Sequence, residues 1–215
     1  LDNPRHVATN REYVTFTGTL DGVPVSVTST GIGCPSAAIA LEELVRCGAD
    51  TFIRVGTSGH IQKDIRSGEL AIISAAIRDE GTSRHYMPIE FPAIADIDVV
   101  LALQAAAKKT GAIHRTGITQ SKDSFYGQHE PERMGVAKDL LERWKAWEIG
   151  GALCSEMEAS ALFVIASMLR VRAGGVMMVH GKEPMPPLDI LLETAVQGLR
   201  ELIAADKAAA RPVTL

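Results

Sequence analysis

Hydrophobic and polar residues alternate along residues 13–20 (YVTFTGTL), as in a strand with one exposed face. Asp21-Gly22 is typical of a two-residue hairpin turn, and residues 23–30 (VPVSVTST) supply the return strand. Short apolar runs predict buried strands at 51–56 (TFIRVG), about 69–78, 113–119 and 171–180. The pattern therefore predicts a hairpin followed by a series of buried strands.

Helical segments separate these strands. Pro35 marks the first turn of a helix that contains ALEELV and ends at Gly48. Further helices are expected at about 96–109, 136–148, 156–169 and 188–207, with polar loops at 121–134 and 180–187. Strands that alternate with helices predict an α/β fold, in which a mixed β-sheet core is flanked by helices on both faces. We expect a single domain, residues 1–215.

Composition narrows the functional classes. A net charge of −4 argues against a nucleic-acid partner, and no apolar run approaches the roughly 18 residues that a membrane span needs. Three cysteines without a C-x-x-C pair predict reduced thiols in a cytoplasmic protein. The six histidines lack metal-ligand spacing and no G-x-S-x-G appears, which argues against metallohydrolases and serine hydrolases.

The glycine-rich segment TGIGCPS (30–36) has a dinucleotide-binding appearance. Ser36 replaces the third glycine of that fingerprint, and no acidic residue ends the next strand. We therefore interpret the segment as a tight turn from strand to helix, whose exposed N–H groups could hold an anion.

Arg54 interrupts the buried strand TFIRVG, and a buried guanidinium requires a partner. The partner is either a protein carboxylate or an anionic ligand at the carboxyl end of the strand. Thr57, Ser58 and the glycines at 56 and 59 follow, and hydroxyl donors beside a cation suit phosphate. We favour the ligand.

CSEMEASAL (154–162) raises a similar choice. Ser155 and Glu158 have capping-box spacing, which predicts a helix start. A carboxylate also accepts two hydrogen bonds, as the diol of a sugar requires. These nine residues alone favour the cap.

DSFYGQHEPER (123–133) combines aromatic, amide and basic side chains. Gln128 could read the carbonyl and N–H edge of a base that Phe125 covers, but a solvated loop is the simpler interpretation of this segment alone. Similarly, Arg11 in NREY is by default a surface arginine.

Taken together, STGIGCPSAAIALEEL, FIRVGTSG, KDSFYGQHEPERM and SEMEASALF resemble the nucleoside phosphorylase family from about Arg11 to Met178. The FYGQ loop is similar to that of members acting on uridine. The resemblance implies phosphorolysis of uridine, or deoxyuridine, to uracil and (deoxy)ribose 1-phosphate in pyrimidine salvage.

The resemblance also implies roles for individual residues. Arg54 and Thr57 resemble phosphate ligands, and Arg11 resembles the arginine that reaches a neighbouring subunit's phosphate. Met157 and Glu158 match the ribose-binding pair, with Glu156 in support, so that the diol role of Glu158 is now favoured. Gln128 matches the glutamine that reads uracil in the family. The arginine beside that glutamine in the family falls on either Arg133 or His129 of this chain, and we choose Arg133. The base pocket would be lined by Phe125, Ser58 and Gly59.

The same resemblance implies partners. No cofactor is required beyond phosphate as co-substrate, and a monovalent cation such as K+ is implied at Glu12, Ile32 and Ser36. A homo-oligomer built from dimers, as in the hexamers of the family, is expected.

The chain departs from the family in three places. A preceding strand with a Gly-Asp-Pro loop is missing, so we expect the opening of the protein to be absent. The segment after 180 is short, and the base-protonating aspartate of purine-specific members has no counterpart. The alternatives are a purine nucleoside phosphorylase or nucleosidase of the family, and a truncated, inactive nucleoside-binding paralogue.

Overall fold

The structure is a computed structural model that describes residues 1–181 and 183–209. Its first part is an antiparallel sheet of three strands, β1 (Asp2–Asn10), β2 (Tyr13–Leu20) and β3 (Val23–Thr28). The predicted hairpin joins β2 to β3, and Asp21 and Gly22 adopt positive φ angles of 52° and 83°, as its turn requires. Strand β1 was not predicted, because its residues are all exposed and lack alternation.

The main sheet has the order β6-β5-β7-β8-β4-β9. Its strands are β4 (Thr51–His60), β5 (Leu70–Asp79), β6 (Ala93–Ile94), β7 (His114–Lys122), β8 (Cys154–Glu156) and β9 (Arg172–His180). Parallel and antiparallel pairs occur together, which confirms the predicted mixed sheet. The amino-terminal half of β5 also pairs with β9, so five of the strands form a closed ring.

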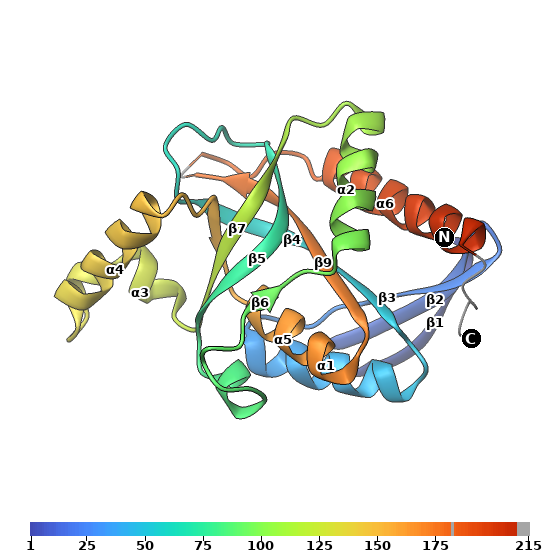
Figure 1. Cartoon of the computed structure of the whole chain (residues 1–215), viewed down its shortest axis with the longest axis horizontal. Helices are drawn as coiled ribbons and strands as arrows, with labels where there is room; N and C mark the ends of the chain where they lie inside the picture. Colours follow the sequence, from blue (N-terminus) through green and yellow to red (C-terminus); the bar gives the residue numbers. More distant parts are fainter. Residues whose placement is uncertain (182, 210–215) are drawn as a thin grey trace.

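Helices cover both faces of this sheet, as predicted. On one side, α1 (Cys34–Arg46) packs with α5 (Ala159–Leu169), and on the other α2 (Ile97–Thr110) packs with α6 (Asp189–Ala208) (Figure 1). Successive side chains of β5 face the two helical layers in turn. Leu70 and Ile72 join the core under α2 and α6, whereas Ala71 and Ile73 join the core under α1 and α5.

Two predicted boundaries were wrong. The segment 121–134 is not a loop, because it contains the end of β7, helix α3 (Phe125–His129) and a 3-10 turn (Pro131–Arg133) before α4 (Ala137–Ile149). The expected helix at 156–169 begins only at Ala159, because Cys154–Glu156 forms β8 between β7 and β4. The 180–187 segment follows β9, and its residue 182 lies outside the described part.

Within the described residues, no helix combines the length and apolarity needed to cross a membrane. Cys34, Cys47 and Cys154 are free thiols, as the sequence predicted.

Candidate active site

A buried ion-pair cluster joins β4 to the segment after β8. Arg54 Nε lies 2.8 Å from Glu156 Oε2, and Arg54 Nη2 lies 2.5 Å from Glu158 Oε2. Burial lowers the pKa of Arg54, but the two carboxylates outweigh it and the net pKa is raised. The protein-carboxylate alternative is therefore realised for Arg54, and its role as a phosphate ligand stays a prediction.

Glycine makes room for this cluster. A Cβ at Gly56 would lie 2.9 Å from Arg54 Nη1, so the guanidinium occupies space that only a glycine leaves open. The predicted strand 51–56 also continues to His60, which places Thr57, Ser58 and Gly59 on β4 itself rather than on a following loop.

Glu156 organises the start of α5. Its Oε2 accepts hydrogen bonds from the backbone N–H groups of Glu158 (2.7 Å) and Ala159 (2.9 Å), and its Oε1 accepts one from Ser121 Oγ. The predicted capping box of Ser155 and Glu158 was therefore wrong. Ser155 belongs to β8, and Glu156 supplies the carboxylate that satisfies the free N–H groups.

Glu158 faces the start of α1 instead. Its Oε1 accepts a hydrogen bond of 2.5 Å from the backbone N–H of Gly33, in the glycine-rich turn whose residues Gly31 and Gly33 have φ angles of 65° and 102°. Cys34 Sγ donates to the Met157 carbonyl at 3.2 Å. The turn predicted at 30–36 is thus confirmed, and it brings the Gly33 N–H and the Cys34 thiol to the Met157–Glu158 pair.

The base-reading candidate, Gln128, contacts the middle residue of β8. Ser155 Oγ donates to Gln128 Oε1 at 2.8 Å, and a Cβ at Gly59 would lie 3.4 Å from Gln128 Nε2. Gln128, Ser155 and Gly59 are therefore neighbours. Since Ser155 and Glu156 are consecutive, β8 connects the predicted base site to the Arg54 cluster.

The remaining residues of this segment lie farther out. Phe125 is 51% exposed and packs on His129 with ring centroids 4.3 Å apart. Arg133 pairs with Glu130 and lies 5.3 Å from the Tyr126 ring centroid. The described contacts thus do not bring Arg133 to Gln128. Burial lowers the pKa of His129, and the neighbouring Lys122 acts in the same direction.

Arg11 and Glu12 form the turn between β1 and β2, where both are exposed. The single hydroxyl hydrogen of Ser36 is shared between Glu12 Oε1, 2.6 Å from Oγ, and the Thr30 carbonyl, and the bond to Glu12 lowers the pKa of that carboxyl. Ile32 is 78% exposed on the adjoining turn. Two of the three predicted cation-site residues, Glu12 and Ser36, are therefore in contact.

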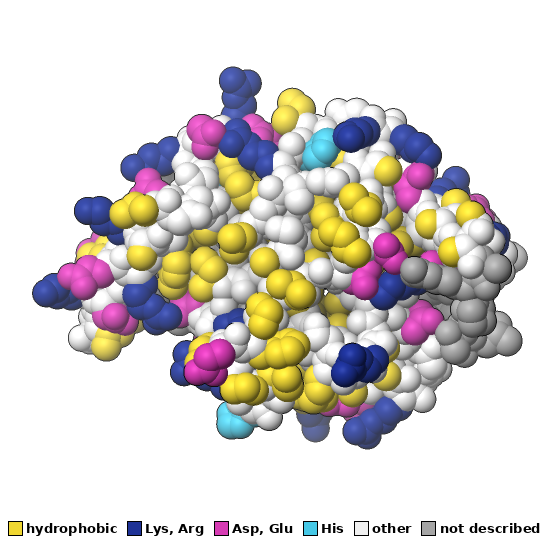
Figure 2. All heavy atoms as spheres, in the orientation of Figure 1, with side chains coloured by type: hydrophobic (Ala, Val, Ile, Leu, Met, Phe, Trp, Pro, Cys, Tyr) yellow, Lys and Arg dark blue, Asp and Glu magenta, His cyan; other side chains and the backbone are white. Residues whose placement is uncertain are grey.

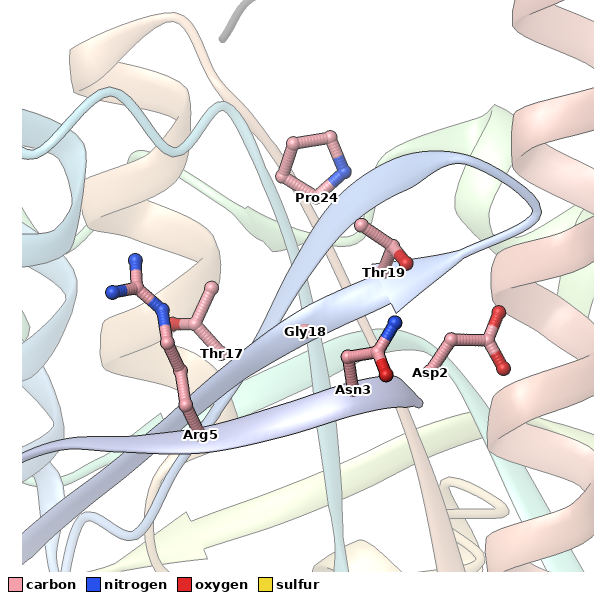
Figure 3. A pocket seen from close by; sticks show the side chains of 7 residues that line it. All are labelled: Asp2, Asn3, Arg5, Thr17, Gly18, Thr19 and Pro24. Carbon is pink, nitrogen blue, oxygen red and sulfur yellow. The ribbon is translucent and has the colours of Figure 1, made fainter.

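Figure 3 shows a separate pocket of about 300 Å³ on the three-stranded sheet. It is lined by Asp2, Asn3, Arg5, Thr17, Gly18, Thr19 and Pro24. None of these is a predicted site residue, so this pocket is distinct from the Arg54 cluster.

Sequence reasoning missed the polar residues that support the site. Gln120, Ser121 and Lys122 are buried on β7, and each bonds to Ser155 or Glu156. Lys122 was hidden in the segment taken as a loop. Lys122, like Arg54, is a charge within a strand. It would have been identified for that reason if the predicted strand had extended beyond residue 119.

Comparisons with known proteins identify relatives of this chain. The chain is 54% identical to a uridine phosphorylase of Treponema pallidum (strain Nichols), over 85% of this chain and 71% of that protein. It is 36% identical to a uridine phosphorylase of Escherichia coli (strain K12), over 95% of this chain and 83% of that protein. It is also 38% identical to a guanosine phosphorylase of Halorubrum lacusprofundi, over 84% of this chain and 70% of that protein.

The profile of the Phosphorylase superfamily matches residues 1–206, which covers nearly the whole chain. The predicted sites all lie within the matched region. The chain therefore belongs to the phosphorylase superfamily.

Proposed function

We propose that this protein is a pentosyltransferase that cleaves uridine, or deoxyuridine, with phosphate, giving uracil and (deoxy)ribose 1-phosphate for pyrimidine salvage. The observation that carries the proposal is the strand β8, which holds Ser155 against Gln128 and Glu156 against Arg54. A base reader and a cation are thus linked through adjacent residues. The 54% and 36% identity to two uridine phosphorylases supports this assignment.

The proposed reaction uses positioning rather than a protein nucleophile. A phosphate oxygen attacks C1′ of the sugar while the bond from C1′ to the base breaks and leaves its electron pair on the base. Glu158 holds the 2′- and 3′-hydroxyls and stabilises the cationic ring, while Gln128 donates to a base oxygen. Met157 lies beside Glu158 in the ribose site, and Phe125, Ser58 and Gly59 line the base site.

The charge of the cluster bears on how phosphate binds. Arg54 faces two carboxylates, so the three side chains together carry a formal charge of −1. A phosphate dianion therefore needs further cations. Thr57 and Arg54 would supply part of its site, and Arg11 of a neighbouring subunit supplies another cation. Arg133, our choice over His129, reaches the base only if its segment moves.

An oligomer built from dimers, a hexamer in its full form, is part of the proposal. Figure 2 shows hydrophobic side chains over the middle of one face, where β5, β6 and β7 run in Figure 1. Exposed large hydrophobic residues on these strands include Ile94, 52% exposed, and Ile118, 38% exposed. Such surface is suited to contact with another copy.

We propose no cofactor besides the phosphate co-substrate. A monovalent cation such as K+ fits the oxygen donors at Glu12 and Ser36, since carboxylate, hydroxyl and carbonyl groups are ligands of hard cations. Ile32 lies on the adjoining turn, between β3 and α1. Action in the cytoplasm on free nucleosides, without a nucleic-acid or membrane partner, completes the proposal.

The second candidate is phosphorolysis of a purine nucleoside, which the 38% identity to a guanosine phosphorylase favours. Product analysis separates the two. With phosphate present, we expect uracil and ribose 1-phosphate from uridine and no base from inosine or guanosine. Release from purine nucleosides alone would replace the proposal by the second candidate, and release of free ribose would indicate a nucleosidase.

A further inference from the structure

Lys122 is a buried cation that the proposed reaction has not yet used. It is 6% exposed at the end of β7, and its Nζ donates to Ser155 Oγ at 2.8 Å. Its hydrogen-bond partner is therefore a neutral hydroxyl. The two glutamates that attract its charge, Glu156 and Glu158, are both paired with Arg54.

The bonds around Ser155 run in one direction. Lys122 donates to Ser155, whose single hydroxyl hydrogen is shared between Gln128 Oε1 at 2.8 Å and Gln120 Oε1. Gln120 is itself held by its Nε2, which donates to Asp79 Oδ2 at 2.7 Å. With its carbonyl oxygen held by Ser155, Gln128 keeps its Nε2 group on the side of Gly59, available to donate to a ligand.

Donors arranged in this way strengthen one another. An ammonium that donates to a hydroxyl oxygen makes that hydroxyl a better donor, and a polarised amide carbonyl makes its own N–H groups better donors. The effect is largest in a site that excludes water. The positive charge of Lys122 is thereby transmitted to the two hydrogens on Gln128 Nε2.

We propose that Lys122 is a positioning residue for departure of the base: acting through Ser155, it orients and polarises the amide of Gln128 to stabilise negative charge on the leaving base. This inference rests on the proposed function. The bond from C1′ to the base breaks, its electron pair stays on the base, and the new bond from phosphate oxygen to C1′ forms. The proton that hydrogen phosphate brought in finally neutralises the base, so no other reactant is needed.

The test compares two leaving groups in the full-length chain, uridine and 5-fluorouridine, whose fluorinated base leaves more easily as an anion. We expect Lys122→Met to lower kcat/KM about a hundredfold for uridine but only about tenfold for 5-fluorouridine. The smaller loss is expected because a better leaving group depends less on stabilisation of its negative charge. Lys122→Arg should restore part of the loss. Lys145→Met, an exposed lysine on α4, is the matched control and should leave both values unchanged.

An equal loss on both substrates, or no loss on either, would overturn the role of Lys122. Inactive wild-type protein would instead contradict the proposed function, so the two failures are distinguishable. If Lys122→Met does not fold, Ser155→Ala interrupts the same chain of bonds and must show the same dependence on the leaving group.

Discussion

Arg54 Nε lies 2.8 Å from Glu156 Oε2, and this pair joins two strands whose residues are 102 positions apart. The Glu156 side chain has no exposed surface and that of Arg54 is 13% exposed. Glu156 also receives three further hydrogen bonds, from Ser121 and from two backbone N–H groups. The same carboxylate therefore fixes the guanidinium and the start of α5.

The first prediction concerns stability. Glu156→Gln removes one of the two carboxylates that pair with Arg54 and weakens the acceptor for two backbone N–H groups, and breaking one side of a buried pair costs about 3–5 kcal/mol. We expect the free energy of unfolding in urea to fall by about 3 kcal/mol. Glu142→Gln, which removes an exposed pair with Lys138, should change it by less than about 0.5 kcal/mol. Equal losses of unfolding free energy in the two variants would show that the buried pair stabilises the protein no more than the exposed pair does.

The second prediction concerns space at Arg54. Gly56→Ala puts a methyl group 2.9 Å from Nη1 and must displace the guanidinium. We expect the KM for phosphate to rise about tenfold, a loss of about 1.4 kcal/mol in binding, and to rise further in Arg54→Ala. Gly135→Ala is the control, because an added Cβ there meets nothing within 4 Å. Normal phosphate saturation of both Arg54 and Gly56 variants would remove Arg54 from the phosphate site.

The third prediction concerns Glu158. Glu158→Gln keeps the shape of the side chain but removes the charge that would support a cationic sugar ring. We expect the variant to lose about 2–4 kcal/mol of transition-state stabilisation. This loss is measured as a lower kcat/KM for uridine. An unchanged kcat/KM would leave Glu158 only its contacts with Gly33 and Arg54.

The fourth prediction concerns pH. Burial lowers the pKa of Lys122 to about 8 from 10.5, although Glu156 and Glu158 act in the opposite direction and Arg54 in the same one. Below pH 8 both folded and unfolded chains carry the charge, and the folded chain bears the full net penalty for burying it, on the order of 3 kcal/mol. Between about pH 8 and 10.5 the unfolded chain binds more protons, so this penalty fades as pH rises.

Lys122→Met should therefore be more stable than wild type at pH 7, and the difference should shrink towards pH 10.5. Urea unfolding at pH 7 and pH 10 measures it. A variant that is less stable than wild type at both pH values would show that the bond to Ser155 outweighs the buried charge.

The sequence predicted most elements, because their signals are local. The Asp21-Gly22 turn determines its hairpin, and the helix 96–109 was found within a residue of α2, whose Asp96 side chain caps it. Strand β8 has three residues and no local signal, so its pairing with β4 and β7 depends on the tertiary fold. The closure of the sheet through β5 and β9 likewise depends on non-local pairing.

In the candidate site, too, residues with a local signal were predicted and residues that depend on strand pairing were not. A charge within a buried strand identified Arg54, resemblance assigned roles to Glu156, Glu158 and Gln128, and the structure brings these residues together around β8. Their partners could not be read from spacing, because Ser121 and Lys122 reach the site only through the parallel pairing of β7 with β8. Arg11 stays a prediction, since its role requires a second subunit.

Uracil release from uridine by the purified chain, measured with and without phosphate, is the first test of the proposed phosphorolysis. We expect release that depends on phosphate and yields ribose 1-phosphate in equal amount. Release at the same rate without phosphate, or no release under either condition, would contradict it.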